Sequence, residues 1–231
     1  MNVAKIWVYL SASPLLWLTA TLGAYAIAER ISVRLDRHPL ANPILIAVAI
    51  LIGLLKASST AFPVYFEGAK FVHFMLGPAT VALAVPLAEN FAEVRRNLIP
   101  MVVALLAGSA TAVASAVFMA WILGADATMI ASIAPKSVTT PIAMGISERI
   151  GGLPAVTAIL VIATGIIGAV IVTPIMNLFG IRDWAARGFA AGVSAHGIGT
   201  ARAFLVNPLA GTFAGIGMGL NGVVTALIIG L

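Results

Sequence analysis

Three polar stretches interrupt an otherwise apolar chain, and they hold the residue types suited to binding chemistry. Residues 134–141 (APKSVTTP) place a lysine and three hydroxyls between two prolines. Residues 194–202 (SAHGIGTAR) place a histidine and an arginine around two glycines, which permit positive φ. Residues 67–80 contain the pair Gly77-Pro78, where a helix is expected to stop and restart.

These stretches predict a site for a small carboxylate. A helix that restarts presents free N–H groups and a partial positive charge, and both favour an anion. Lys136 or Arg202 would balance the negative charge, while hydroxyls such as Ser137 would hydrogen-bond the ligand. The complete predicted substrate site consists of Gly77, Pro78, Ala79, Thr80, Lys136, Ser137, Thr139, Thr140, His196, Gly197, Gly199, Thr200 and Arg202.

A structural role is the competing interpretation for several of these residues. Glycine and proline are common in membrane helices, so Gly77-Pro78 alone indicates a kink as readily as a site. A single Ser or Thr often bonds back to its own helix. Glu67 and Lys70 are three residues apart and are expected to form a plain surface pair. Lys136 stands out because a charge within an apolar block is a functional hypothesis by default.

The elements that position these stretches must lie in a membrane. Of the 231 residues, 61% are hydrophobic and 9% are charged, whereas soluble domains carry about 25% charged residues. A transmembrane helix needs about 20 apolar residues. Six stretches reach or approach that length, and two more are interrupted by proline, glycine or charge; the six are residues 6–28, 44–62, 71–88, 98–123, 153–179 and 208–231, and the two are residues 125–150 and 184–206.

Other functional classes are a poor match. The net charge of +5 comes from scattered basic residues, so we expect no nucleic-acid partner. The chain has no cysteine, no Gly-x-Ser-x-Gly and no metal-spaced histidines, so we expect neither an enzyme nor a metal or organic cofactor. Asp126 and Asp183 border helix starts and are expected to be N-caps.

The order and spacing of marker residues repeats along the chain. Pro43 and Pro63 are 20 residues apart, as are Pro154 and Pro174. The Glu-Arg-Ile triplet at 29–31 recurs at 148–150, and the Gly, Gly, Thr spacing at 68, 77 and 80 recurs at 188, 197 and 200. We interpret this as a single domain, 1–231, built from two homologous halves near residues 1–123 and 124–231.

The repeat leaves two topologies open. If each broken stretch is re-entrant, each half crosses the membrane three times and the halves are inverted; if it crosses, the halves are parallel. We favour an all-α polytopic protein with about six transmembrane helices, two broken or re-entrant elements and inverted repeats. Repeats of this kind are typical of secondary transporters.

Three blocks carry a family resemblance. Residues 68–87, 133–171 and 187–203 resemble the signature blocks of the LrgB/CidB family, and the strings APKSVTTP and SAHGIGTARA are specific to it. The resemblance spans nearly the whole chain, except for the helix that ends near His38. It implies a multi-pass protein of the bacterial inner (cytoplasmic) membrane.

The resemblance implies two different activities. Family members are named as antiholin-like proteins that modulate murein hydrolase activity and lysis beside a small LrgA/CidA-type membrane partner. Related proteins in plant chloroplast envelopes carry glycolate and glycerate, and bacterial members are linked to pyruvate. A homo-oligomer is also expected.

Two hypotheses follow. The first is a secondary transporter of a small monocarboxylate, of the glycolate, glycerate, lactate or pyruvate class, working by alternating access and coupled, if at all, to a proton or cation. The alternative is the antiholin-like regulator, which needs glycine faces on intact helices such as residues 211–219. The duplicated broken stretch favours transport.

Overall fold

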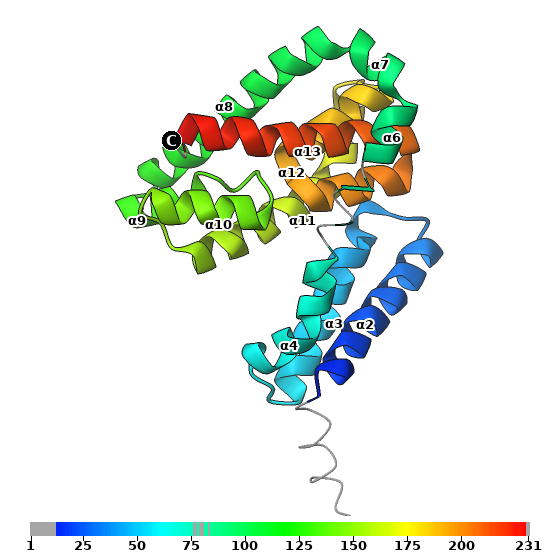
Figure 1. Ribbon diagram of the computed structural model, residues 1–231, viewed down its shortest axis with the longest axis vertical. Helices are drawn as coiled ribbons and strands as arrows, with labels where there is room; N and C mark the ends of the chain where they lie inside the picture. Colours follow the sequence, from blue (N-terminus) through cyan, green and yellow to red (C-terminus); the bar gives the residue numbers. More distant parts are fainter. Residues whose placement is uncertain (1–12, 76–77, 79–80, 83, 230–231) are drawn as a thin grey trace, which may run out of the picture. The chain divides into compact units, whose positions relative to one another are not determined.

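The computed structural model describes residues 13–229 except 76–77, 79–80 and 83 (Figure 1). Every regular element within those residues is helical, which confirms the all-α expectation for this part of the chain. The helices are α2 (Pro14–Arg34), η1 (Pro39–Ala41), α3 (Pro43–Ala57), α4 (Phe62–Phe74), α6 (Ala84–Glu89), α7 (Phe91–Arg96), α8 (Leu98–Ile122), α9 (Ala127–Ile133), α10 (Thr140–Arg149), α11 (Pro154–Leu178), α12 (Trp184–Val206) and α13 (Pro208–Ile229).

Membrane-spanning length is reached by a subset of the helices. Among the described residues, α8, α11 and α13 are long and apolar enough to cross a bilayer, while α3 is apolar but shorter. The chain is therefore a membrane protein with several apolar helices, and the count of six spans and the inverted repeats stay predictions. The span expected over residues 71–88 lies partly outside the described residues and stays a prediction; within the described part, α4 ends at Phe74 and α6 begins at Ala84.

The chain divides into two compact units, Met1–Ala84 and Val85–Leu231. In the first unit, α2 packs against α3 and α4. Gly68 of α4 lies so close to α2 that a Cβ there would overlap the backbone near Pro14. The buried Trp17 packs edge-on against Tyr65, with ring centroids 6.0 Å apart. Glu67 and Lys70 form the predicted surface ion pair.

Helix starts follow the local sequence signals. Pro43 and Pro154 each occupy the first turn of a helix, where a missing N–H costs nothing. Asp126 Oδ1 accepts a hydrogen bond from Met129 N at 2.7 Å. Asp183 Oδ1 accepts one from Ala186 N at the same distance. The predicted N-caps are thus confirmed.

The second unit is organised around α12, which packs against α13, α11 and α8. Helices α12 and α13 lie side by side (Figure 1). Gly188 and Gly192 of α12 face Ala210 and Ala214 of α13 so closely that a Cβ on either glycine would overlap the opposite backbone. Small residues four apart on both helices permit this approach, as in many membrane helix pairs.

The glycine-rich face of α13 is used inside the chain. A Cβ on Gly211 would overlap the ring of Phe204, and a Cβ on Gly217 would meet the Phe189 carbonyl. Phe213 is buried in an apolar cluster with residues of α7, α8 and α12. The expectation that residues 211–219 offer an association surface is therefore corrected for this part of α13, because α12 already covers it.

Candidate functional site

The predicted break at residues 134–141 is present. Helix α9 ends at Ile133, the chain turns through 134–138, and α10 begins at Thr140 with Thr139 as its extended N-cap residue. Ser137 and Val138 are buried, whereas Lys136 is partly exposed. Lys136 Nζ donates to Ser137 Oγ at 3.3 Å. Within the described part of the chain, Lys136 forms no ion pair with an acidic residue.

A buried group of hydroxyls fixes this segment to α11. Thr157 Oγ1 lies 2.9 Å from the Ser132 carbonyl and 2.7 Å from Ser147 Oγ. Ser132 Oγ accepts a hydrogen bond from Leu153 N at 2.8 Å. All three hydroxyl residues are fully buried. They anchor both helices that flank Lys136, and nothing in the sequence other than their hydroxyl groups marks them as a cluster.

The third stretch breaks α12, but not at its glycines. Ala195 (φ −125°, ψ 17°) and His196 (φ 41°, ψ −134°) leave helical geometry inside α12. Neither Gly197 nor Gly199 has positive φ, so the expectation that these glycines supply the left-handed conformation is wrong. Gly199 is needed for space instead, because a Cβ there would crowd the Ala191 carbonyl and Ala195.

The neighbouring helix α11 explains why His196 adopts this conformation. His196 Nε2 lies 2.9 Å from the Val161 carbonyl, to which it donates because a carbonyl can only accept. The imidazole ring occupies the space that a Cβ on Gly165 would take, and Ala195 occupies the space beside Gly168. The histidine is 4% exposed. Its side chain is therefore bound to α11 at the point where α12 breaks.

Asn221 of α13 connects the two breaks. Its Nδ2 donates to the Val193 carbonyl at 2.9 Å and to the Ser137 carbonyl at 3.2 Å. Its Oδ1 accepts from Ser109 Oγ at 2.5 Å and from Thr225 Oγ1 at 3.3 Å. Asn221 is completely buried. A single side chain thus bonds the backbone at both breaks, and its position as an asparagine in the middle of the apolar block 208–231 was the signal that could have identified it.

Lys136 lies at a cavity of about 380 Å³. Its other polar lining residues are Thr164 of α11 and Ser194 of α12, the latter next to the break at Ala195. The remaining lining is apolar and comes from α11. Neither Thr164 nor Ser194 belongs to the site predicted from the sequence.

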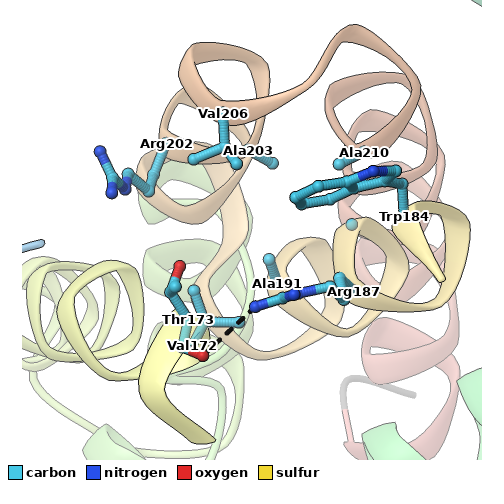
Figure 2. Close-up of a pocket in the computed structure, with 10 residues that line it drawn as sticks. Val172, Thr173, Trp184, Arg187, Ala191, Arg202, Ala203, Val206 and Ala210 are labelled. Atoms are coloured by element: carbon cyan, nitrogen blue, oxygen red, sulfur yellow. Dashed lines mark hydrogen bonds between the residues drawn. The ribbon is translucent and has the colours of Figure 1, made fainter. Parts of the chain in front are cut away.

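Arg202 lines a different and smaller cavity. That cavity holds about 30 Å³, the space of about one water molecule, and it is also lined by Arg187 and Trp184. Figure 2 shows the guanidinium of Arg202 directed away from those two side chains. Arg202 is 5% exposed. The two cations proposed to share one carboxylate therefore line separate cavities.

Arg187 has a structural role at the end of α11. Its Nη2 donates to Asn177 Oδ1 at 2.6 Å and to the Thr173 carbonyl at 3.3 Å, the latter drawn in Figure 2. The guanidinium also lies 5.1 Å from the centre of the Trp184 ring. A cation near a helix C-terminus is electrostatically favourable. Arg187 therefore joins the last turns of α11 to the start of α12.

The other predicted residues are placed as follows. Thr200 is buried and donates to the His196 carbonyl at 2.8 Å, four residues earlier in α12. This bond within its own helix is the structural role that competes with ligand binding. Thr139 and Thr140 form the start of α10. Pro78 belongs to the first unit, and Gly77, Ala79 and Thr80 lie outside the described residues. The structure therefore brings Lys136, Ser137 and the break at His196 together.

Comparisons with known proteins agree on one group. The family model described as LrgB-like family matches residues 21–231. The chain is 38% identical to "Uncharacterized protein YwbG" of Bacillus subtilis, over 90% of this chain and 92% of that protein. It is 30% identical to "Antiholin-like protein LrgB" of Bacillus mycoides (94% of each chain) and 28% identical to "Holin-like protein CidB" of Staphylococcus epidermidis (96% and 95%). No solved structure matches the chain.

Proposed function

Because the chain belongs to the LrgB-like family, we propose that it is an antiholin-like protein of the bacterial inner membrane that regulates murein hydrolase activity and cell lysis. The observation that carries this proposal is similarity over nearly the full length to relatives named holin-like and antiholin-like. The proposal includes a small LrgA/CidA-type membrane partner. Because α12 covers Gly211 and Gly217 of α13, that partner would bind outside this part of the glycine face.

The regulator is tested in cells. The chain is expressed, with and without an LrgA/CidA-type partner, in a bacterium from which its own relatives have been deleted. Extracellular murein hydrolase activity and the rate of lysis after membrane depolarisation are measured. Expression should lower both relative to an empty vector. Unchanged hydrolase activity and lysis, with the protein present in the membrane, would contradict the proposal.

A second candidate is a secondary transporter of a small monocarboxylate. It is favoured by the buried polar group that joins the two breaks, namely Asn221 with the Ser137 and Val193 carbonyls. Beside this group, Lys136 lies at a cavity and forms no ion pair with any acidic residue that the structure describes. Polar and ionisable groups within the membrane are costly and typically line substrate or ion pathways. Transport would proceed by alternating access, with a proton or cation as the coupled ion if the process is active.

Uptake into liposomes separates the two candidates. Purified protein is reconstituted and supplied with labelled glycolate, glycerate, lactate or pyruvate. Transport predicts uptake that Lys136→Gln abolishes and that Lys56→Gln, an exposed lysine of α3, leaves intact. Folded protein that takes up none of the four acids would contradict transport. If the Lys136→Gln variant still regulates lysis, then regulation does not depend on the cavity at Lys136.

A further inference from the structure

The cavity beside Lys136 combines one cation with two hydroxyls and a long apolar wall. The cation and hydroxyls come from three different elements: the segment between α9 and α10, helix α11 and helix α12. The apolar wall is a single face of α11, and its residues are Ile167, Gly168, Ile171, Val172, Ile175 and Met176. A ligand that fills the cavity therefore meets polar groups and hydrocarbon at once.

Lys136 and Thr164 lie toward one end of the cavity. The segment that carries Lys136 is anchored near the start of α11, through Ser132 to Leu153 and Thr157. Thr164 is the first of the α11 lining residues, so it lies at the end nearest that anchor. From Thr164 the wall continues for 12 residues to Met176, which is about 18 Å of helix. The cavity thus changes from polar to apolar along α11.

The size of the cavity exceeds what a two- or three-carbon acid fills. About 380 Å³ falls in the range of about 300–1,000 Å³ that holds drug-sized ligands. A water-sized group occupies about 30 Å³, so room remains for several methylene groups after the carboxylate is placed. Filling that room with hydrocarbon would cover the exposed side chains of Ile167 and Ile171.

We propose that this cavity binds a monocarboxylate with an apolar chain of several carbons, with its carboxylate at Lys136 and Thr164 and its chain along the α11 wall. A single lysine matches one negative charge, and the Thr164 hydroxyl supplies a further hydrogen bond of the kind that a desolvated ion pair needs. The Ser194 hydroxyl donates to the Ala190 carbonyl at 2.7 Å and only lines the cavity. The inference deepens the transporter candidate by naming a substrate class, and it rests on that candidate only for movement across the membrane, not for binding.

Binding is measured on the full chain in lipid nanodiscs by calorimetry, with empty nanodiscs subtracted. The probes are acetate, butyrate and hexanoate, with hexanol as the uncharged match. Affinity should rise along the acid series by up to about fourfold per methylene, the fold-change that about 0.8 kcal/mol per buried CH₂ gives. Hexanoate should bind at least about tenfold more tightly than hexanol because only the acid pairs with Lys136.

Substitutions test the polar end and the apolar wall of the cavity separately. Lys136→Gln should remove the preference for hexanoate over hexanol, whereas Lys136→Arg should retain it. Ile171→Ala should weaken hexanoate severalfold and leave acetate unchanged. Lys56→Gln, and Ile159→Ala on the exposed face of α11, are matched controls that should behave as the unmodified protein. Thr164→Val provides a second route should Lys136→Gln fail to fold, and it should weaken hexanoate severalfold.

Three results would overturn the proposal: equal affinity for acetate and hexanoate, equal affinity for hexanoate and hexanol, or unchanged hexanoate binding in folded Lys136→Gln and Thr164→Val. Liposome uptake distinguishes the proposed binding site from the proposed transport activity. Chain-length-dependent binding without uptake of hexanoate would contradict transport and support the site. Uptake of short acids without chain-length-dependent binding would support transport and overturn the site.

Discussion

The two breaks that Asn221 joins are built in different ways. Residues 134–139 separate two helices, contain Pro135, are followed by Pro141 and include an extended N-cap residue, so their own sequence explains the break. The break in α12 has no proline, and its positive φ belongs to His196 although Gly197 follows. There the conformation is set by α11, which accepts the imidazole hydrogen bond at Val161 and leaves space at Gly165.

A break in a membrane helix can therefore be determined either by the residues of the broken segment or by the residues of the helix that packs against it. In the first case the prolines lack the N–H that would continue the helix. In the second case a strained residue persists because surrounding contacts over-determine it. Substitutions on α11 should therefore affect the α12 break strongly and the 134–139 segment less, and the predictions below separate the two.

The largest effect is expected from Gly165→Ala. A Cβ there would lie 2.6 Å from His196 Cε1, so the ring must move and its bond to Val161 is lost. Overpacking and the lost hydrogen bond both destabilise the protein, and the better helix propensity of Ala offsets them only in part. We expect the free energy of unfolding to fall by about 2–3 kcal/mol. The measurement is unfolding in mixed micelles titrated with denaturing detergent.

Gly145→Ala in α10 is the matched control, because open space surrounds that glycine. It should stabilise the protein by up to about 1 kcal/mol through helix propensity alone. Equal effects of the two substitutions would show that Gly165 makes no room for the α12 break.

The next largest effect is expected from Asn221→Leu, which removes the side-chain hydrogen bonds to the backbone at both breaks. It leaves the Ser137 and Val193 carbonyls without the amide donor and Ser109 Oγ without its acceptor. Interhelical hydrogen bonds in membranes contribute modestly, so we expect a loss of about 1–2 kcal/mol. Thr225→Val removes only the 3.3 Å contact to Asn221 and should cost far less. Similar losses for the two variants would contradict the central position of Asn221.

The same contrast explains how far sequence alone could go. Prolines and a lysine marked the 134–141 break, and aspartates marked two helix caps, because these signals act on neighbouring residues. Gly165 and Gly168 look like ordinary glycines of an apolar helix in the sequence, since the side chains for which they leave room lie 27 or more residues away. The separation of Lys136 from Arg202 likewise depends on how α12 packs, which no local pattern records.

A smaller effect isolates the backbone at the α12 break. His196→Ala and His196→Gly both lose the imidazole and its bond to Val161, so only the cost of φ 41° differs between them. The glycine variant should be more stable by about 1 kcal/mol because it adopts positive φ without steric cost. At the other break, Ala134 has φ −51° and ψ −47°, so Ala134→Gly should show no advantage for glycine and should lose up to about 1 kcal/mol. A glycine advantage of equal size at both positions would contradict a difference in how the two breaks are built.

The smallest effect is expected where the 134–139 segment is tied to α11. Thr157→Val keeps the side-chain shape and removes the hydroxyl that contacts the Ser132 carbonyl and Ser147 Oγ. The cost should be about 0.5–1 kcal/mol, with Thr111→Val on the exposed side of α8 as the control that should cost nearly nothing. Because the prolines hold this break by themselves, accessibility of Lys136 to an amine-reactive reagent should stay within about twofold of the unmodified protein. A larger rise in Lys136 reactivity would show that the first break, like the second, depends on α11 for its shape.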